Sequence, residues 1–132
     1  MLAKSKKYPI KQHKIVKLET DFAGIKEGAM LFVATREIIE AYMYTIPAGE
    51  FRTIHRLRNE LARKYNCDAT CPVSTAIFIR QIAEIALIEL HNGKAKNEIA
   101  PFWRLVEPDS KIAKKLEIDN NWIQLQREIE SN

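Results

Sequence analysis

The hydrophobic pattern of the chain is most pronounced between residues 73 and 90, where apolar side chains fill a segment of helix length. On a helix, the polar residues of this segment share one narrow stripe, and the apolar residues occupy the rest of the circumference. A helix that is apolar around most of its surface belongs in a protein core. The pattern therefore predicts a buried central helix with other elements packed on several of its sides. The polar stripe consists of Arg80, Gln81, Glu84 and His91.

The start of this central helix is well marked. Pro72 suits the first helical position, where a missing N–H costs nothing, and Ser74 and Thr75 follow it. The amides of Val73, Ser74 and Thr75 are then free at the positive end of the helix, which favours a phosphate ligand. A capped core helix without any ligand explains the same residues.

Two more helices are predicted before the central one. Residues 36–44 have helical periodicity after a candidate N-cap at Thr35, and a second helix over 54–65 follows a candidate N-cap at Thr53. A short polar turn then leads to the central helix, and helix, turn and helix in this order are typical of a DNA-binding helix-turn-helix. The second helix has a basic outer face made of His55, Arg56, Arg58, Arg63 and Lys64.

Shorter elements flank these helices. Residues 14–18 and 100–106 are candidate strands, and the second of them suggests the wing of a winged helix. Short helices are expected from Asp109 or Ser110 to Leu116 and again near the C-terminus. The last helix would place Trp122, Leu125 and Ile129 on one apolar face. The predicted fold is mainly α, a winged-helix-like helix-turn-helix domain with a small β element.

Composition places the chain among globular proteins of one domain. Its 132 residues include 46% hydrophobic and 29% charged residues, and no stretch has the length and apolarity of a membrane span. The N-terminus has no apolar secretory segment, so a cytoplasmic location is expected. Cys67 and Cys71 form neither a disulfide framework nor a zinc finger. No cofactor or metal is expected.

Charge divides the chain into two parts. Residues 1–30 hold seven lysines and three acidic residues, whereas residues 31–132 hold fourteen basic and fourteen acidic residues. The first part is therefore interpreted as a basic N-terminal segment and the second as the folded domain. A basic terminus is either a solvated end or an arm that contacts nucleic acid.

Catalytic motifs are missing from the sequence. No phosphate-binding glycine loop, zinc-protease motif or serine-hydrolase elbow is present, and the three histidines lie far apart along the chain. Cys71 lies at a helix N-terminus, where thiol pKa values are lowered, so it is a candidate nucleophile as well as a buried cap. No other residue is a candidate for catalysis.

Two segments carry a resemblance to a known family. Ile46-Pro47-Ala48-Gly49-Glu50-Phe51-Arg52-Thr53 resembles the segment that precedes the helix-turn-helix in O6-alkylguanine-DNA alkyltransferases and alkyltransferase-like proteins. Pro101-Phe102-Trp103-Arg104-Leu105-Val106 is similar to their active-site strand. The match covers about residues 33–130, which implies an alkyltransferase-like winged-helix DNA-binding domain over 31–132 without the N-terminal domain of the full enzymes.

The departures from the family pattern limit the expected activity. Phe102 takes the place of the alkyl-accepting cysteine and Trp103 that of its activating histidine, whereas Arg104 is kept. Without a thiol at this position the resemblance implies no alkyl transfer there. Thr70-Cys71-Pro72-Val73-Ser74 also resembles the helix start of an uncharacterised bacterial group with a Pro-Trp-Trp-Arg strand.

These observations predict non-catalytic binding of double-stranded DNA, with a role in sensing alkylated or flipped bases during DNA repair. The resemblance implies a base pocket lined by Phe102, Trp103 and Arg104. The expected DNA-binding residues are Arg52, Thr53, Arg56, Arg58, Val73, Ser74 and Thr75.

Three alternatives stay open. The chain is a winged-helix transcriptional regulator or nucleoid-type DNA binder without lesion recognition, a thiol-dependent alkyltransferase that uses Cys71, or a domain whose groove binds a protein. A downstream repair or regulatory protein is a further expected partner, and no membrane partner is expected.

Overall fold

The computed structural model describes residues 12–131, so the first eleven residues of the predicted basic segment lie outside the described part. The described part begins with a hairpin of two antiparallel strands, β1 (Lys14–Lys17) and β2 (Met30–Val33). A two-residue strand, β3 (Ala69–Thr70), pairs in parallel with β2, which gives the sheet order β1-β2-β3. The strand predicted to begin at Lys14 is confirmed.

Three helices follow the hairpin. They are α2 (Arg36–Tyr44), α3 (Ile54–Lys64) and α4 (Pro72–His91). The first two have the predicted threonine caps: a side-chain oxygen accepts a hydrogen bond from the backbone N–H three residues later in each case. All three helices are confirmed close to their predicted limits, and α3, a turn containing β3, and α4 follow one another as expected.

The C-terminal part is made of short turns and helices: η1 (Lys96–Glu98), η2 (Phe102–Arg104), α5 (Lys111–Lys115) and α6 (Trp122–Ser131). The strand predicted over 100–106 is wrong. Its backbone closes local turns instead, with the Arg104 N–H donating to the Pro101 carbonyl and the Val106 N–H to the Phe102 carbonyl. The apolar side chains of this segment point into the core from a 3-10 turn, so their pattern resembled that of a half-buried strand.

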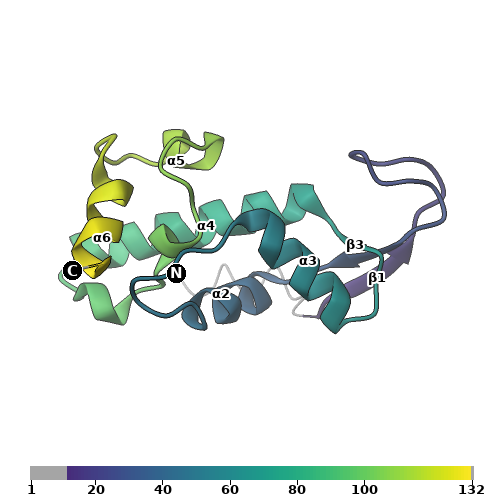
Figure 1. The fold of residues 1–132 in the computed structure, drawn as a ribbon, viewed down its shortest axis with the longest axis horizontal. Helices are drawn as coiled ribbons and strands as arrows, with labels where there is room; N and C mark the ends of the chain where they lie inside the picture. Colours follow the sequence, from purple (N-terminus) through teal and green to yellow (C-terminus); the bar gives the residue numbers. More distant parts are fainter. Residues whose placement is uncertain (1–11, 132) are drawn as a thin grey trace.

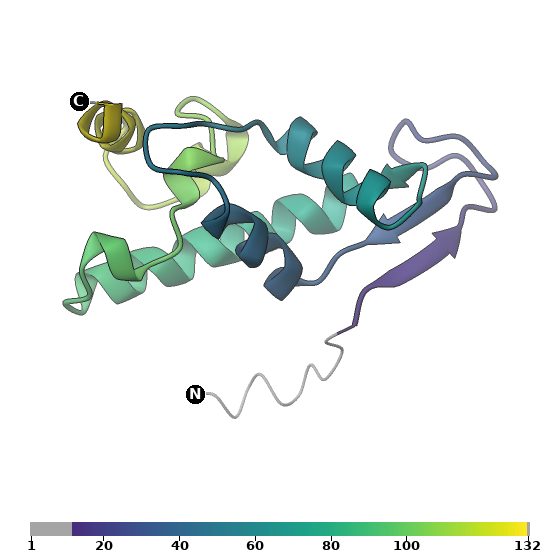
Figure 2. The same ribbon diagram turned by 60° about the horizontal axis from the view of Figure 1, so that its bottom comes forward.

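The core lies between α2, α4 and the C-terminal segments. In both ribbon views α4 is the long central helix, with the hairpin near its N-terminal end and α6 near its other end (Figures 1 and 2). Side chains from every part of the chain meet along it. The largest buried ones include Phe32, Ile39, Met43, Ile46, Leu57, Ile79, Ile99, Phe102, Leu105 and Ile123.

The central helix is buried on one side only, which corrects the expectation that it is enclosed on several sides. Thr75, Ile79 and Ile82 are buried, whereas Ile77 is 50% and Ile88 is 59% exposed. The reason is that α2 and η2 pack against one side of α4. Four aliphatic residues, Val73, Ile77, Ile85 and Ile88, therefore face outward together with the polar stripe.

The last helix differs from its predicted orientation in a similar way. Leu125 and Ile129 are about half exposed, and the buried face of α6 is made of Ile123, Gln126 and Arg127. Polar groups in the core explain this orientation, because Arg127 donates hydrogen bonds to the carbonyls of Trp103 and Val106. The protein is therefore mainly α with a small three-stranded sheet. In the described part of the chain, every helix falls short of the length and apolarity needed to cross a bilayer.

Candidate nucleic-acid interface

Helix α3 has four basic residues and one acidic residue, and the shorter α5 has the same net charge from three lysines. Arg56, Arg63 and Lys64 are exposed, and Arg58 is half buried. Arg63 and Lys64 occupy the last turn, where cations are favourable near the negative end of the helix. This face is the part of the fold best suited to a polyanion such as the phosphate backbone of DNA.

A small polar network lies at the start of α3. Arg56 Nε donates to Glu60 Oε2 at 2.8 Å, and the Tyr42 hydroxyl donates to Glu60 Oε1 at 2.6 Å. The hydrogen bonds from Tyr42 and then Arg56 lower the pKa of Glu60, whereas burial, followed by the contact with Glu60, raises the pKa of Tyr42. Glu60 is therefore an anion that holds Arg56, and a phosphate would have to compete with it.

Arg52 reaches the same network from the loop before α3. Its backbone N–H donates to the Arg104 carbonyl at 2.9 Å, and its guanidinium lies 5.5 Å from the centre of the Tyr42 ring. The side chain makes one long hydrogen bond, to Thr45 at 3.3 Å, and its Nε atom is buried without a hydrogen-bond partner. Arg52 is therefore held by packing against the Tyr42 ring more than by strong hydrogen bonds. Thr53, by contrast, is engaged as the N-cap of α3.

Arg58 has a structural role in addition to its charge. Its Nε donates to the Thr70 carbonyl at 3.4 Å, and the Thr70 hydroxyl donates to the Arg58 carbonyl at 2.7 Å. These contacts tie the middle of α3 to β3, one residue before the N-cap of α4. The structure thus brings Arg58, one of the residues expected to contact DNA, close to the start of α4.

The N-terminus of α4 differs in part from its prediction. Pro72 occupies its first turn and Val73 is 50% exposed. Thr75 does not have the free amide that was expected: it is fully buried, and both its N–H and its hydroxyl donate to the Cys71 carbonyl. The reason is that Thr75 is already the fourth residue of the helix, where intrahelical bonds begin. The Ser74 hydroxyl is buried and lacks a hydrogen-bond partner.

The residues expected to line a base pocket fill a closed core. Phe102 is 0% and Trp103 is 2% exposed. Phe102 stacks on Trp122 with ring centres 5.5 Å apart, and Trp103 meets the Trp122 ring edge-on at 5.9 Å. A base could enter this position only if at least one of these rings moved.

Arg104 is fixed by the C-terminal helix. Its Nη2 lies 2.7 Å and its Nε 3.0 Å from the two carboxylate oxygens of Glu130, and its Nη1 donates to the Ile46 carbonyl at 2.8 Å. Burial, the largest single effect, raises the pKa of Glu130, but the hydrogen bonds from Arg104, Trp103 and the Gly49 backbone and the charge of Arg104 together outweigh it, so the pKa of this carboxyl is lowered. This ion pair, together with Arg127, joins α6 to η2 and to the turn at 46–49.

Sequence reasoning missed Arg127 and Glu130. Burial lowers the pKa of Arg127, whose guanidinium lies 4.4 Å from the centre of the Phe51 ring. A signal was available, because Arg127 and Glu130 are charged residues spaced by three beside the apolar positions of the last helix. The spacing alone does not show that their partners lie in η2.

The two cysteines do not form a reactive pair. Cys71 is 7% exposed, and its backbone holds the start of α4 through a hydrogen bond to the Phe32 carbonyl. Cys67 is half buried, and burial raises the pKa of its thiol. Within residues 12–131, no cluster of three or more His, Cys, Asp or Glu side chains is arranged to hold a metal ion.

Comparison of the chain with protein-family models, with curated proteins and with solved structures found no match.

Proposed function

We propose that this protein binds double-stranded DNA without catalysing a reaction on it, with α3 as the main contact. The observation that carries the proposal is the group of exposed basic residues on α3, Arg56, Arg63 and Lys64, together with the half-buried Arg58 and with Arg52 in the loop before the helix. Basic side chains on a helix of fixed position can contact DNA phosphates, and such contacts provide most of the non-specific affinity for DNA.

The start of α4 would complete the interface. The pair of contacts between Arg58 and Thr70 holds α3 next to the N-terminal end of α4. The amides of Val73 and Ser74 precede the first intrahelical bonds, so they are the ones that remain for a phosphate oxygen. We include in this proposal a relationship to winged-helix proteins and to the alkyltransferase family. The proposed relationship is based on α3 and α4, and not on a wing.

Sensing of an alkylated base is a finer version of the same proposal. Its support is that Trp103 Nε1 is buried without a hydrogen bond of good geometry, although it lies close enough to the Glu130 carboxylate to help lower the pKa of that group. A base that displaced a neighbouring ring would therefore compete with Glu130 for this donor. The cost is separation of the stacked rings of Phe102 and Trp122. Lesion binding should therefore be slower than simple DNA binding, because it requires this rearrangement.

The test is fluorescence anisotropy with two short duplexes that differ only by one O6-methylguanine, measured at several salt concentrations. Binding is expected to weaken as salt rises. Replacement of Arg63 and Lys64 by Gln should reduce the slope of log K against log salt by about one for each phosphate that these side chains neutralise. Replacement of Lys114 and Lys115 in α5 by Gln removes the same charge elsewhere and is the matched control. No binding at low salt would refute the proposal.

The duplex with O6-methylguanine distinguishes lesion sensing from DNA binding without lesion recognition. A preference for O6-methylguanine that disappears in Trp103→Phe would support lesion sensing, whereas equal affinity for both duplexes would leave a DNA binder without lesion recognition. Covalent alkylation of Cys71 during the incubation, detected by intact-protein mass spectrometry, would instead favour the thiol-dependent alkyltransferase.

A further inference from the structure

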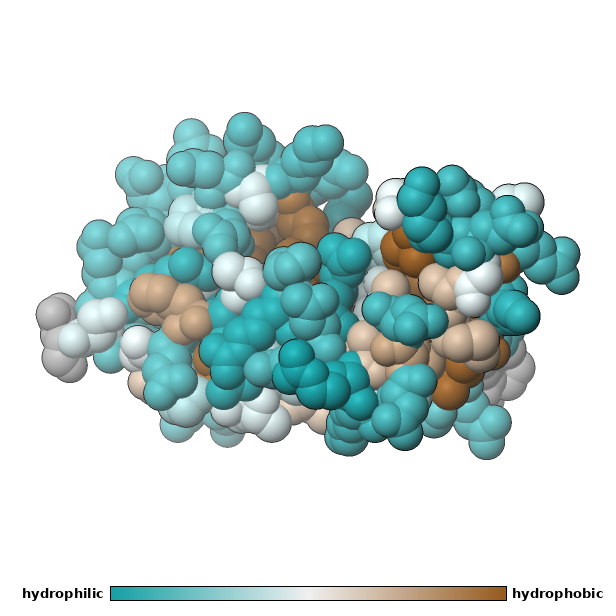
Figure 3. Space-filling view, turned by 45° about the vertical axis from the view of Figure 1, so that its right-hand side comes forward, coloured by the Kyte–Doolittle hydropathy of each residue, from teal (hydrophilic) through white to brown (hydrophobic). Residues whose placement is uncertain are grey.

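Among residues 12–131, nothing pairs with the outer edge of β1, which makes it an open strand edge within this part of the chain. β1 is the first strand in the sheet order, and among the described residues only β2 pairs with it. All four of its residues are exposed, and Ile15 and Val16 keep 47% and 41% of their surface accessible. In Figure 3 hydrophobic residues gather at the right-hand end of the molecule, where the hairpin lies. Open strand edges are the places where extended segments add to a sheet.

The hydrogen-bond pattern shows which backbone groups are free at this edge. The Leu18 N–H donates to the Ala29 carbonyl at 2.9 Å, so residue 18 directs its groups toward β2. Because residues of an antiparallel pair alternate in this respect, Val16 and Lys14 also face β2. Ile15 and Lys17 therefore direct their N–H and C=O groups outward. The two N–H groups and two C=O groups of these residues can therefore form hydrogen bonds with one more strand.

The side chains at this edge favour one kind of partner. Successive side chains point to opposite faces, so Lys14 and Val16 share one face while Ile15 and Lys17 share the other. An antiparallel partner strand with the order acidic, aliphatic, aliphatic, acidic would set a carboxylate against each lysine and an aliphatic group against each aliphatic one. Opposite charges across a strand pair are favourable and like charges are unfavourable.

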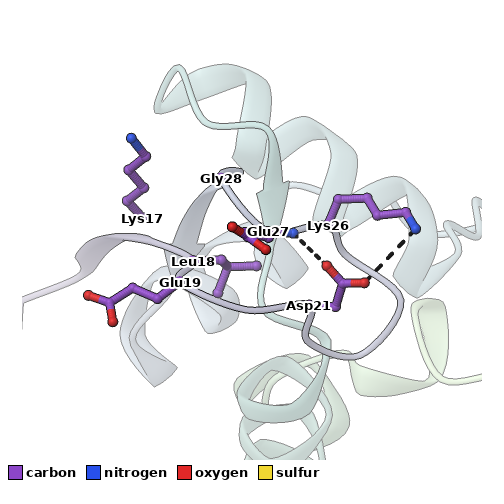
Figure 4. Close-up of a pocket in the computed structure, with 7 residues that line it drawn as sticks. All are labelled: Lys17, Leu18, Glu19, Asp21, Lys26, Glu27 and Gly28. Carbon is purple, nitrogen blue, oxygen red and sulfur yellow. Dashed lines mark hydrogen bonds and ion pairs between the residues drawn. The ribbon is translucent and has the colours of Figure 1, made fainter.

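The charges at and near this edge disfavour two other ligands, a second copy of the chain and nucleic acid. A second copy of the chain, added in antiparallel orientation, can pair only outward-facing residues with each other, so Ile15 would lie opposite Lys17 and Val16 opposite Val16, and each Lys17 would face an aliphatic side chain instead of a carboxylate. Nucleic acid is disfavoured by the hairpin loop, where Glu19, Asp21 and Glu27 lie near the end of β1 (Figure 4). The lysine of this loop, Lys26, is already 3.9 Å from Asp21.

We propose that the outer edge of β1 binds an extended segment of a partner protein in which two acidic residues flank a pair of aliphatic residues. The segment would extend the three-stranded sheet by one strand. This binding is separate from the proposed DNA interface on α3, and either activity could be lost without the other.

A charge exchange tests the proposal. The full chain is titrated with a labelled peptide that carries Thr-Glu-Val-Ile-Glu-Thr at its centre, and with a peptide in which both Glu residues are replaced by Lys. The acidic peptide should bind about tenfold more tightly than the basic one, and the double variant Lys14→Glu with Lys17→Glu should reverse this order. The double variant Lys114→Glu with Lys115→Glu has the same net charge and should leave the order unchanged.

Amide hydrogen exchange locates the contact. Without peptide, the outward amides of Ile15 and Lys17 should exchange faster than the amide of Val16, which faces β2. Saturation with the acidic peptide should slow exchange at Ile15 and Lys17 and leave Val16 nearly unchanged. Equal binding of both peptides, or protection confined to other residues, would overturn the proposal. Protection of these two amides that grows with protein concentration in the absence of peptide would also overturn it, because the occupant would then be a second copy.

Discussion

The ion pair between Arg104 and Glu130 should determine how firmly the C-terminal helix is held. The two side chains are 17% and 16% exposed, and two hydrogen bonds of 2.7 and 3.0 Å join them. Opposite charges near 4 Å at an effective dielectric constant of about 20 attract by about 4 kcal/mol, and desolvation of both groups takes back part of this. We therefore expect Glu130→Gln to lower the free energy of unfolding by about 2–3 kcal/mol at neutral pH.

The pH dependence of this effect has a definite direction. The pKa of Glu130 is lowered in the folded protein, so folding favours its ionised form. The stability it contributes is fully present above the carboxyl's pKa in the unfolded chain, and is lost as pH falls through the lower pKa of the folded state. The difference between wild type and Glu130→Gln should accordingly shrink below about pH 4.

Urea unfolding followed by circular dichroism measures both expectations. Glu128→Gln is the matched control: Glu128 is an exposed residue on the same helix, and its replacement should change stability by less than about 0.5 kcal/mol. A double-mutant cycle with Arg104→Met should give a coupling energy of about 1–3 kcal/mol. A coupling energy near zero, or a stability difference that does not vary with pH, would refute the reasoning.

Three further predictions concern local structure and use the same unfolding assay. Thr53→Ala should destabilise the protein by about 1 kcal/mol through loss of the α3 cap, and Thr53→Ser should retain most of that stability. Gly49→Ala should cost about 1–2 kcal/mol, because Gly49 has φ of +89° and the added Cβ would lie 3.3 Å from the Glu130 carbonyl oxygen; a neutral result would contradict the observed turn. Ile79→Ala should cost about 2–5 kcal/mol, whereas Ile88→Ala on the exposed side of the same helix should cost far less, and equal losses would mean that α4 is enclosed after all.

Local signals in the sequence located the helices. Thr35, Thr53 and Pro72 mark helix starts by chemistry that acts within one turn, so α2, α3 and α4 begin at or next to the expected residues. Residues 100–106 were misassigned because a short apolar run indicates burial without specifying backbone conformation. That segment lies in the core of the C-terminal part, where a tight turn satisfies N–H groups such as those of Arg104 and Val106, while side-chain and backbone donors from distant residues satisfy several of its carbonyls.

Burial on particular faces was harder to predict, because it depends on which neighbours exist. The apolar circumference of α4 indicated neighbours on several sides, yet α2 and η2 occupy one side and Ile77 stays half exposed. The candidate site shows the same limit. The sequence identified the arginines correctly as charges, but their partners, such as Glu60 and Glu130, became apparent only when distant segments were brought together.

The partners of the arginines also indicate which of them could serve the proposed DNA interface. Arg104 and Arg127 donate to acceptors in the protein interior, so their removal from these acceptors would leave buried polar groups unpaired, which is costly. Arg56 is held only by Glu60 in a pair exposed to solvent, and pairs of this kind contribute little. Arg56 can therefore exchange its carboxylate for a phosphate at small cost, whereas Arg104 cannot. Contact with DNA should begin on α3 and involve Arg104 only if the closed aromatic core opens.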